Sequence, residues 1–262
     1  MITCNFFSGV YNYNVPADMK WPDMVKKHYD EFDEKKLVTL LETIRGYGID
    51  YVELWEPHAS YKTLSGKDAQ RIRSICLDKG LTPLVYCIGG WRHEHLDIIE
   101  RGFEFAEGLG ANVINGVIQN TENEEVLAKI DDCCKRYKIR FSIENHASPA
   151  LESPEEVQKV LDSYSDYIGA NLDVGIYHRT GYDVLKAAKL FGDRIYHVHF
   201  KDVVQGAVRG SCPSGEGAAP LKELAAYLKG VNYPYMVSIE YEPRFDPTED
   251  LKRSVAYCKS IC

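Results

Sequence analysis

The chain has 262 residues, of which 45% are hydrophobic, and its formal net charge is −8 at pH 7. That length suits one α/β barrel, and the apolar share is enough for a full core. An acidic chain without runs of lysine or arginine is a poor match for nucleic acid or for an anionic membrane surface, so we expect neither as a partner.

The N-terminal residues and the cysteines favour a cytoplasmic location. The opening stretch MITCNFFSGV lacks the charged and apolar regions of a signal peptide, and no run of about 18 apolar residues suggests a membrane span. The eight cysteines are scattered and form no C-x-x-C pair. We therefore expect reduced thiols rather than a zinc–thiolate site.

Strand-like and helix-like segments alternate along the whole chain. Short β-branched and aromatic runs predict strands at 2–7, 50–55, 81–88, 111–118, 138–144, 168–173, 194–200 and 234–240. Amphipathic runs lie between them, and one starts with a capping box in which Ser153 precedes Pro154 and Glu156. Eight such units predict an α/β fold, a single (β/α)₈ TIM barrel with residues 1–262 as one domain. No G-x-G-x-x-G follows the first strand, which disfavours a doubly wound nucleotide-binding fold.

Four polar residues stand at the ends of the last four predicted strands: Glu144, Asp173, His199 and Glu240. Catalytic groups of a TIM barrel come from the carboxyl ends of its strands, so these four should converge. Three carboxylates and an imidazole at one point would need a divalent cation to offset their repulsion. We expect Mn²⁺, with Mg²⁺, Co²⁺ or Zn²⁺ as alternatives. Taken singly, each residue is more simply explained as a solvated or salt-bridged side chain; the prediction rests on the set.

Other polar and aromatic residues near the strand ends are predicted substrate contacts. His197 shares a face with His199 one pleat deeper, where it could also orient a metal ligand by a hydrogen bond. The tryptophans could stack on a sugar or only pack, and the lysine could bind substrate or only pair with Asp202. The predicted substrate-binding residues are Glu53, Trp55, Trp91, His178, His197 and Lys201.

Several motifs carry a family resemblance: IENH at 143–146, LDVG at 172–175, HVHFKD at 197–202, SGEGAAPLKELAAYL at 214–228 and SIEYEP at 238–243. Together they resemble the sugar phosphate isomerase/epimerase superfamily. This xylose isomerase-like barrel group includes hydroxypyruvate isomerases, ketose 3-epimerases, inosose dehydratases and endonuclease IV nucleases.

The resemblance implies roles for the four strand-end residues. Glu144, Asp173, His199 and Glu240 would be the metal ligands, and Glu144 and Glu240 would also be catalytic, moving a proton on the carbon beside a carbonyl while the metal stabilises the enediolate. The chain departs from ketose 3-epimerases, which have an arginine where Gln205 stands and a histidine three residues after the aspartate, whereas His178 lies five after Asp173.

The leading hypothesis is a metal-dependent isomerase or epimerase acting on a small-molecule sugar or keto-sugar. The alternative is elimination on the same scaffold, by an inosose dehydratase-like enzyme or by a lyase that cleaves a 3-keto-glycoside or C-glycoside. A ligand-binding subunit without catalysis is a third hypothesis. A nuclease is disfavoured, because strands two to four offer Glu53, Trp55 and Trp91 in place of histidine ligands. Nothing in the sequence decides between a monomer and a homo-oligomer.

Overall fold

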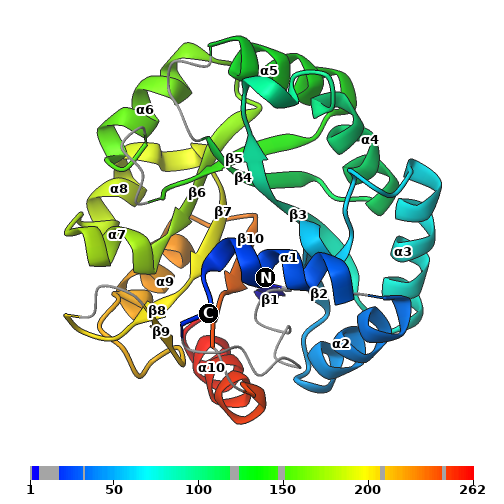
Figure 1. Ribbon diagram of the computed structural model, residues 1–262. Helices are drawn as coiled ribbons and strands as arrows, with labels where there is room; N and C mark the ends of the chain where they lie inside the picture. Colours follow the sequence, from blue (N-terminus) through cyan, green and yellow to red (C-terminus); the bar gives the residue numbers. More distant parts are fainter. Residues whose placement is uncertain are drawn as a thin grey trace.

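Parallel strands form a closed barrel at the centre of the molecule (Figure 1). The computed structural model describes residues 2–5, 18–31, 33–118, 124–146, 151–206, 210–243 and 246–262. Within these ranges the barrel strands are β1 (Ile2–Asn5), β2 (Tyr51–Trp55), β3 (Thr82–Trp91), β4 (Val113–Ile118), β5 (Arg140–Glu144), β6 (Ile168–Asp173), β7 (Ile195–Phe200) and β10 (Met236–Ile239). They close in the order β1-β10-β7-β6-β5-β4-β3-β2, which confirms the predicted (β/α)₈ barrel. Each lies in its predicted range, except that β3 extends beyond 88; residues 6 and 7 of the first range lie outside the described residues.

Helices surround the barrel, and α1 (Trp21–Glu31) lies across the centre of the view in Figure 1. The outer ring consists of α2 (Glu34–Gly46), α3 (Gly66–Asp78), α4 (Ile99–Leu109), α5 (Glu124–Tyr137), α6 (Pro154–Ser163), α8 (Val184–Phe191), α9 (Leu221–Gly230) and α10 (Thr248–Ile261). Shorter elements are α7 (Val174–Thr180) and the 3₁₀ helices η2 (Glu56–His58), η3 (His93–His95) and η4 (Gly192–Arg194). The predicted capping box starts α6, where the Glu156 amide donates to Ser153 Oγ at 3.2 Å and the Ser153 amide donates back to the Glu156 carboxylate.

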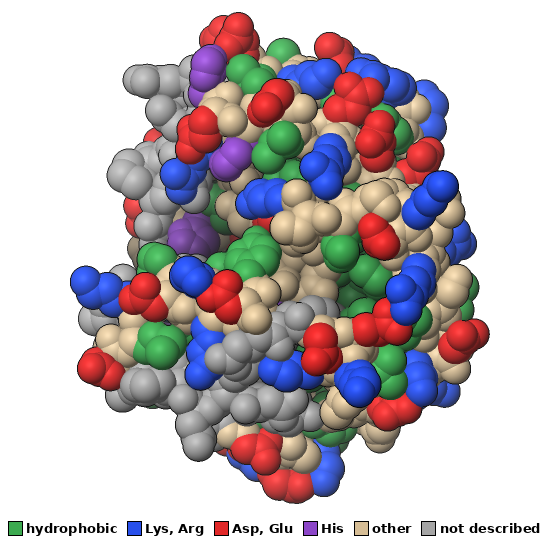
Figure 2. Space-filling view, turned by 45° about the vertical axis from the view of Figure 1, so that its right-hand side comes forward, with side chains coloured by type: hydrophobic (Ala, Val, Ile, Leu, Met, Phe, Trp, Pro, Cys, Tyr) green, Lys and Arg blue, Asp and Glu red, His purple; other side chains and the backbone are tan. Residues whose placement is uncertain are grey.

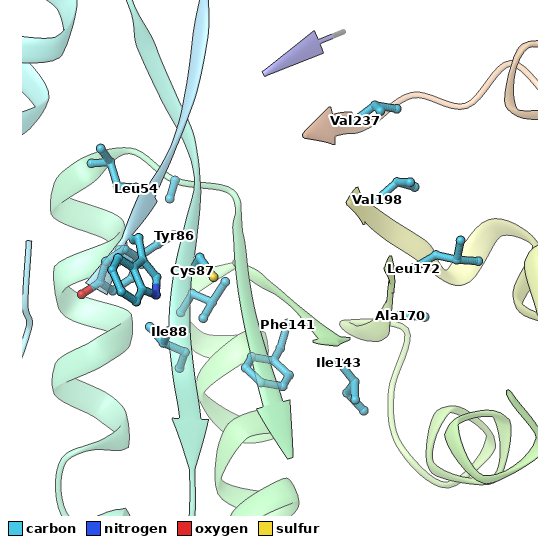
Figure 3. Close-up of a cluster of buried hydrophobic side chains, with 14 of the residues drawn as sticks. Leu54, Tyr86, Cys87, Ile88, Phe141, Ile143, Ala170, Leu172, Val198 and Val237 are labelled. Carbon is cyan, nitrogen blue, oxygen red and sulfur yellow. The ribbon is translucent and has the colours of Figure 1, made fainter. Parts of the chain in front are cut away.

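The strands alternate between polar residues and apolar ones that pack under the helices. Phe141 and Ile143 of β5, with Leu172 of β6 and Val198 of β7, are fully buried in the apolar cluster drawn in Figure 3. Burying a side chain of this size contributes about 1.5–3 kcal/mol, so the apolar positions hold each strand in register against its helix. The same alternation directs the intervening polar residues into the barrel.

A distortion near the end of β3 corrects the prediction for Trp91. The β3–β4 register shifts between Ile88 and Trp91, and Gly90 has φ +88°. A Cβ at Gly90 would lie only 1.8 Å from the Val117 carbonyl oxygen, so a side chain is excluded there. Trp91 is fully buried, with its ring stacked on Phe103 and Phe141. It is therefore a core residue, as the packing alternative expected, and offers no face to a sugar.

A carboxylate after β7 organises the glycine-rich loop that leads to α9. Asp202 begins the short strand β8 (Asp202–Val203), which pairs with β9 (Ser211–Cys212). Its carboxylate accepts hydrogen bonds from the amides of Gly215, Gly217 and Ala219 at 2.8–3.0 Å, as well as from the amide next to it. Asp202 thus holds the loop rather than pairing with the lysine beside it.

The described surface is mixed in charge. On the face drawn in Figure 2, acidic and basic side chains are interspersed rather than gathered by sign. None of the helices in the described ranges is both long and apolar enough to cross a bilayer.

We expect Asp202→Ala to destabilise the protein by about 3 kcal/mol, because several amides lose their charged acceptor at once. Urea denaturation measures the loss. Glu216→Gln is the matched control in the same loop, because Glu216 pairs only at the surface, with Arg253, at 2.6 Å. Equal losses in the two variants would show that the Asp202 carboxylate does not hold the loop.

Candidate functional site

Four side chains at the carboxyl ends of neighbouring strands meet at the barrel mouth. Glu144 and Asp173 are the last residues of β5 and β6, His199 is near the end of β7, and Glu240 directly follows β10. Each offers a ligand atom, and these atoms all lie within 4.8 Å of one another. His199 Nδ1 is 2.9 Å from Glu240 Oε2 and 3.8 Å from Glu144 Oε1. The structure thus brings together the four predicted metal ligands, which we call the carboxylate–histidine cluster.

Asparagine side chains position two of these carboxylates. Asn115 of β4 donates from Nδ2 to Glu144 Oε2 at 3.0 Å. Asn145 makes a pair of bonds with the backbone of Asp173, donating to its carbonyl and accepting from its amide at 2.8 Å. Asp173 Oδ1 accepts from the Ile176 amide at 2.9 Å and so caps α7. Asn115 thus holds the Glu144 carboxylate, the Ile176 amide holds the Asp173 carboxylate, and Asn145 fixes the backbone that carries Asp173.

A second polar layer lies below the cluster. Two positions before each member, on the same face of its strand, stand Ser142, Asn171, His197 and Ser238, all at most 1% exposed. Asn171 Nδ2 lies 3.2 Å from His199 Nδ1. Of these four residues, only His197 was predicted from the sequence to belong to the site. The repeated pairs S-x-E, N-x-D, H-x-H and S-x-E are the signal that could have shown the whole layer.

Glu53 lies in the barrel between two imidazoles. Its Oε2 is 3.0 Å from His197 Nε2, and its Oε1 is 3.1 Å from His199 Nε2. All three residues are completely buried. This corrects the prediction that Glu53 and His197 contact substrate directly, because neither side chain reaches an accessible surface.

Lys201 is surrounded by carboxylates. Its Nζ lies 3.1 Å from Glu240, 3.2 Å from Glu242 and 3.4 Å from Asp173, and the residue is 5% exposed. Its ammonium group therefore supplies one positive charge to the cluster. From the sequence we had expected this lysine either to bind substrate or to pair with Asp202, and neither prediction included this role. Glu242, at 31% side-chain exposure, is the most accessible of these partners.

Burial and unequal contacts separate the pKa values of the cluster. Burial, partly offset by His199, raises the pKa of Glu144 to about 8. Burial, partly offset by Lys201, raises the pKa of Asp173 to about 6. Burial acts the same way on Glu240, but Lys201 and then His199 outweigh it and hold its pKa below the usual range. Burial would lower the pKa of His199, yet the surrounding carboxylates hold it well above its ordinary value.

The donor set fits a divalent cation. Three carboxylates and one imidazole, with all ligand atoms within 4.8 Å of one another, can share one ion. Glu240 Oε2 is buried and lies 2.9 Å from His199 Nδ1, so the two atoms face each other as two ligands of one ion would. Oxygen-rich sets with one imidazole suit Mg²⁺ and Mn²⁺ and also accept Zn²⁺.

The two remaining predicted residues, Trp55 and His178, lie at or beyond the carboxyl ends of β2 and β6. Trp55 ends β2, is 7% exposed and meets the rings of His28 and His58 edge-on, at 5.4 and 5.2 Å between centroids. His178 is half-buried on α7, beyond the end of β6. Glu216 pairs with Arg253 at the surface. Arg209, which could have taken the place of the epimerase arginine, lies outside the described residues.

A family profile described as xylose isomerase-like TIM barrel matches residues 41–261. The chain belongs to this family. No curated protein sequence matches the chain. The xylose isomerase-like assignment confirms the resemblance seen in the sequence motifs.

Solved structures share the xylose isomerase-like fold at low sequence identity. L-ribulose 3-epimerase is 16% identical, with a TM-score of 0.74 over 99% of this chain and 93% of its own. A xylose isomerase-like barrel from Mycobacterium smegmatis, in complex with magnesium, is 15% identical, with a TM-score of 0.75 over 99% and 95%. A probable 3-DHS dehydratase from Bacillus anthracis is 16% identical, with a TM-score of 0.71 over 98% of each chain. At these identities the likeness shows the fold.

We expect divalent cations to bind more tightly as the pH rises. Below pH 8 Glu144 carries a proton that a cation must displace, and below pH 6 so does Asp173. Each displaced proton changes the binding constant about tenfold per pH unit, so Glu144 alone should lower the Mn²⁺ dissociation constant about 100-fold from pH 6 to pH 8. Because His199, with its raised pKa, must also release a proton to bind the ion, the total fall should be larger. Calorimetric titrations in two buffers of different ionisation enthalpy measure affinity and proton release together. An unchanged dissociation constant over this range would contradict the protonation of Glu144.

Proposed function

We propose that the chain is a divalent-metal-dependent isomerase or epimerase of a small-molecule sugar or keto-sugar, which moves a proton on the carbon next to a carbonyl. The observation that carries this proposal is the placement of Glu144 and Glu240. They are 8% and 7% exposed, whereas Asp173 and His199, the other members of the cluster, are at 0%. The two glutamates are thus the members that reach toward the mouth, where a substrate would enter.

The two glutamates approach the cluster from different strands of the barrel. β5 and β10 are separated by β6 and β7 in the closed order, so Glu144 and Glu240 lie on different sides of His199. Two carboxylates on different sides of one carbon allow one to take a proton and the other to return it. This arrangement supports epimerisation or isomerisation over a reaction that needs a single base.

Each glutamate is anchored through one oxygen. Asn115 holds Glu144 Oε2, and Lys201 holds Glu240 Oε1. The other oxygen of each, Glu144 Oε1 and Glu240 Oε2, faces His199. A bound divalent cation would act as a Lewis acid on the substrate carbonyl and so lower the cost of removing the neighbouring proton. Trp55 and His178 are the side chains that we propose for contacts with the sugar.

Elimination is the second candidate. It would use the same two carboxylates, one to remove a proton and the other to protonate the departing hydroxyl or aglycone. Lys201, with its ammonium held against Glu240 and Glu242, could steady a leaving oxygen on that side. A probable 3-DHS dehydratase shares this fold, which is a reason to assay elimination as well as isomerisation.

We expect the Mn²⁺-loaded protein to exchange deuterium from D₂O into a keto-sugar, at the carbon beside the carbonyl, without loss of water. Glu144→Gln and Glu240→Gln, assayed at saturating Mn²⁺, should each slow the exchange by at least about 100-fold, because each removes a proton-transfer group. Glu216→Gln, at the surface, should match the wild-type rate. Proton NMR and mass spectrometry of recovered ketopentoses, ketohexoses and 3-keto-glycosides give the readout.

The products separate the two candidates. Deuterium in recovered sugar without loss of water or aglycone supports the isomerase or epimerase. Loss of water or aglycone supports elimination. A metal-loaded protein that exchanges no proton in any of these sugars would contradict both.

A further inference from the structure

Glu53 belongs to a second buried group that shares one residue with the carboxylate–histidine cluster. Glu53, His197 and His199 also offer ligand atoms within 4.8 Å of one another, and all three are completely buried. His199 therefore stands between the two groups. Its Nε2 faces Glu53 at 3.1 Å, and its Nδ1 faces Glu240 at 2.9 Å.

The hydrogen-bond geometry decides which nitrogen of each imidazole carries a proton. A carboxylate has no proton to give, so an oxygen 3.0–3.1 Å from an imidazole nitrogen accepts from it. Glu53 presents one oxygen to each imidazole, so both Nε2 atoms carry hydrogen. By the same rule His199 Nδ1 donates to Glu240 Oε2 at 2.9 Å when no cation is bound. A cation in the carboxylate–histidine cluster would displace that Nδ1 hydrogen and use the lone pair it leaves, while the Nε2 hydrogen stays on Glu53.

We propose that Glu53 is a positioning residue that acts through both histidines: it fixes the Nε2–H form of His199 and so directs Nδ1 into the carboxylate–histidine cluster. His197 uses the second Glu53 oxygen, so the carboxylate is held by both imidazoles at once. The inference rests on the proposed function only in taking that cluster as the cation site.

The same geometry argues against a second cation at Glu53. An ion there would need the lone pair of His199 Nε2, while an ion in the cluster needs that of Nδ1, and a neutral imidazole cannot serve both. The cluster has three carboxylates and reaches the mouth through its two partly exposed glutamates, whereas the Glu53 group is sealed. We therefore expect one cation per chain, with Glu53 behind the ligand rather than on the ion.

The test compares Glu53→Gln with Glu242→Gln. Glu53→Gln removes a negative charge next to His199, and Glu242→Gln removes one next to Lys201. Only Glu53 contacts the imidazoles of His197 and His199. The glutamine side chain in Glu53→Gln has only one acceptor oxygen, whereas two Nε2–H groups need an acceptor. One of the two histidines must therefore lose either its Nε2 hydrogen or the acceptor for it. Mn²⁺ titration calorimetry should show one site in each protein and an affinity about 10–100-fold weaker in Glu53→Gln than in Glu242→Gln.

Nitrogen-15 NMR of labelled histidines reads the protons directly. In the wild-type protein, both metal-free and Mg²⁺-loaded, His197 and His199 should each show a protonated Nε2, and Glu53→Gln should lose one of the two signals. An Nδ1–H-only form of either histidine in the wild type would overturn the inference, even if the variant fails to fold.

The calorimetric titrations also distinguish a Glu53 that acts through the histidines from a Glu53 that binds an ion itself. Equal Mn²⁺ affinities in the two variants would overturn the inference, and so would two ions bound by the wild type with one in Glu53→Gln, because Glu53 would then be a ligand. A wild type that binds no ion would contradict the proposed metal-dependent function, while the NMR pattern of the metal-free protein would still decide the role of Glu53.

Discussion

The arrangement of the barrel mouth depends on the balance of buried negative charge. Glu53, Glu144, Asp173 and Glu240 all lie at 8% exposure or less, and removing an ionised carboxylate from water costs several kcal/mol unless a positive charge or a proton compensates. Lys201 supplies one fixed positive charge. The protons held on His199 and Glu144, and on Asp173 below about pH 6, supply part of the rest, and a divalent cation can replace them. The raised pKa values and the affinity for a cation are thus two consequences of one constraint.

The barrel places this charge where rigid elements can hold it. Parallel strands end at the same face, so four strand ends deliver four ligand atoms to one point, and the polar layer beneath them fixes the directions of the side chains. The apolar positions between them, such as Ile143 and Leu172, pack under the helices and keep the strands in register. Since the ligands sit on or next to strands rather than in long loops, little conformational entropy remains to be lost when an ion binds.

Much of this arrangement could be predicted from the sequence, because it follows from local periodicity. The eight strands are short apolar runs bounded by helical segments, and Glu144, Asp173, His199 and Glu240 fall at the ends of four of them. Barrel closure then brings these ends together without any further information.

The parts that the sequence did not predict depend on long-range packing. Trp91 turns into the core because of the register shift at Gly90, which is a backbone feature. Glu53 of β2 meets His197 and His199 of β7 across the barrel, between strands that are not neighbours, so no local pattern links them. The short β8–β9 pair likewise depends on contacts made after the chain has folded.

The central claim is that one divalent cation binds between Glu144, Asp173, His199 and Glu240. Anomalous diffraction from a crystal soaked in Mn²⁺, recorded at the manganese absorption edge, tests it most directly. We expect a single strong peak within about 2.5 Å of the three carboxylates and of His199 Nδ1. A peak between Glu53 and His197, on the Nε2 side of His199, or no peak at the barrel mouth, would contradict it.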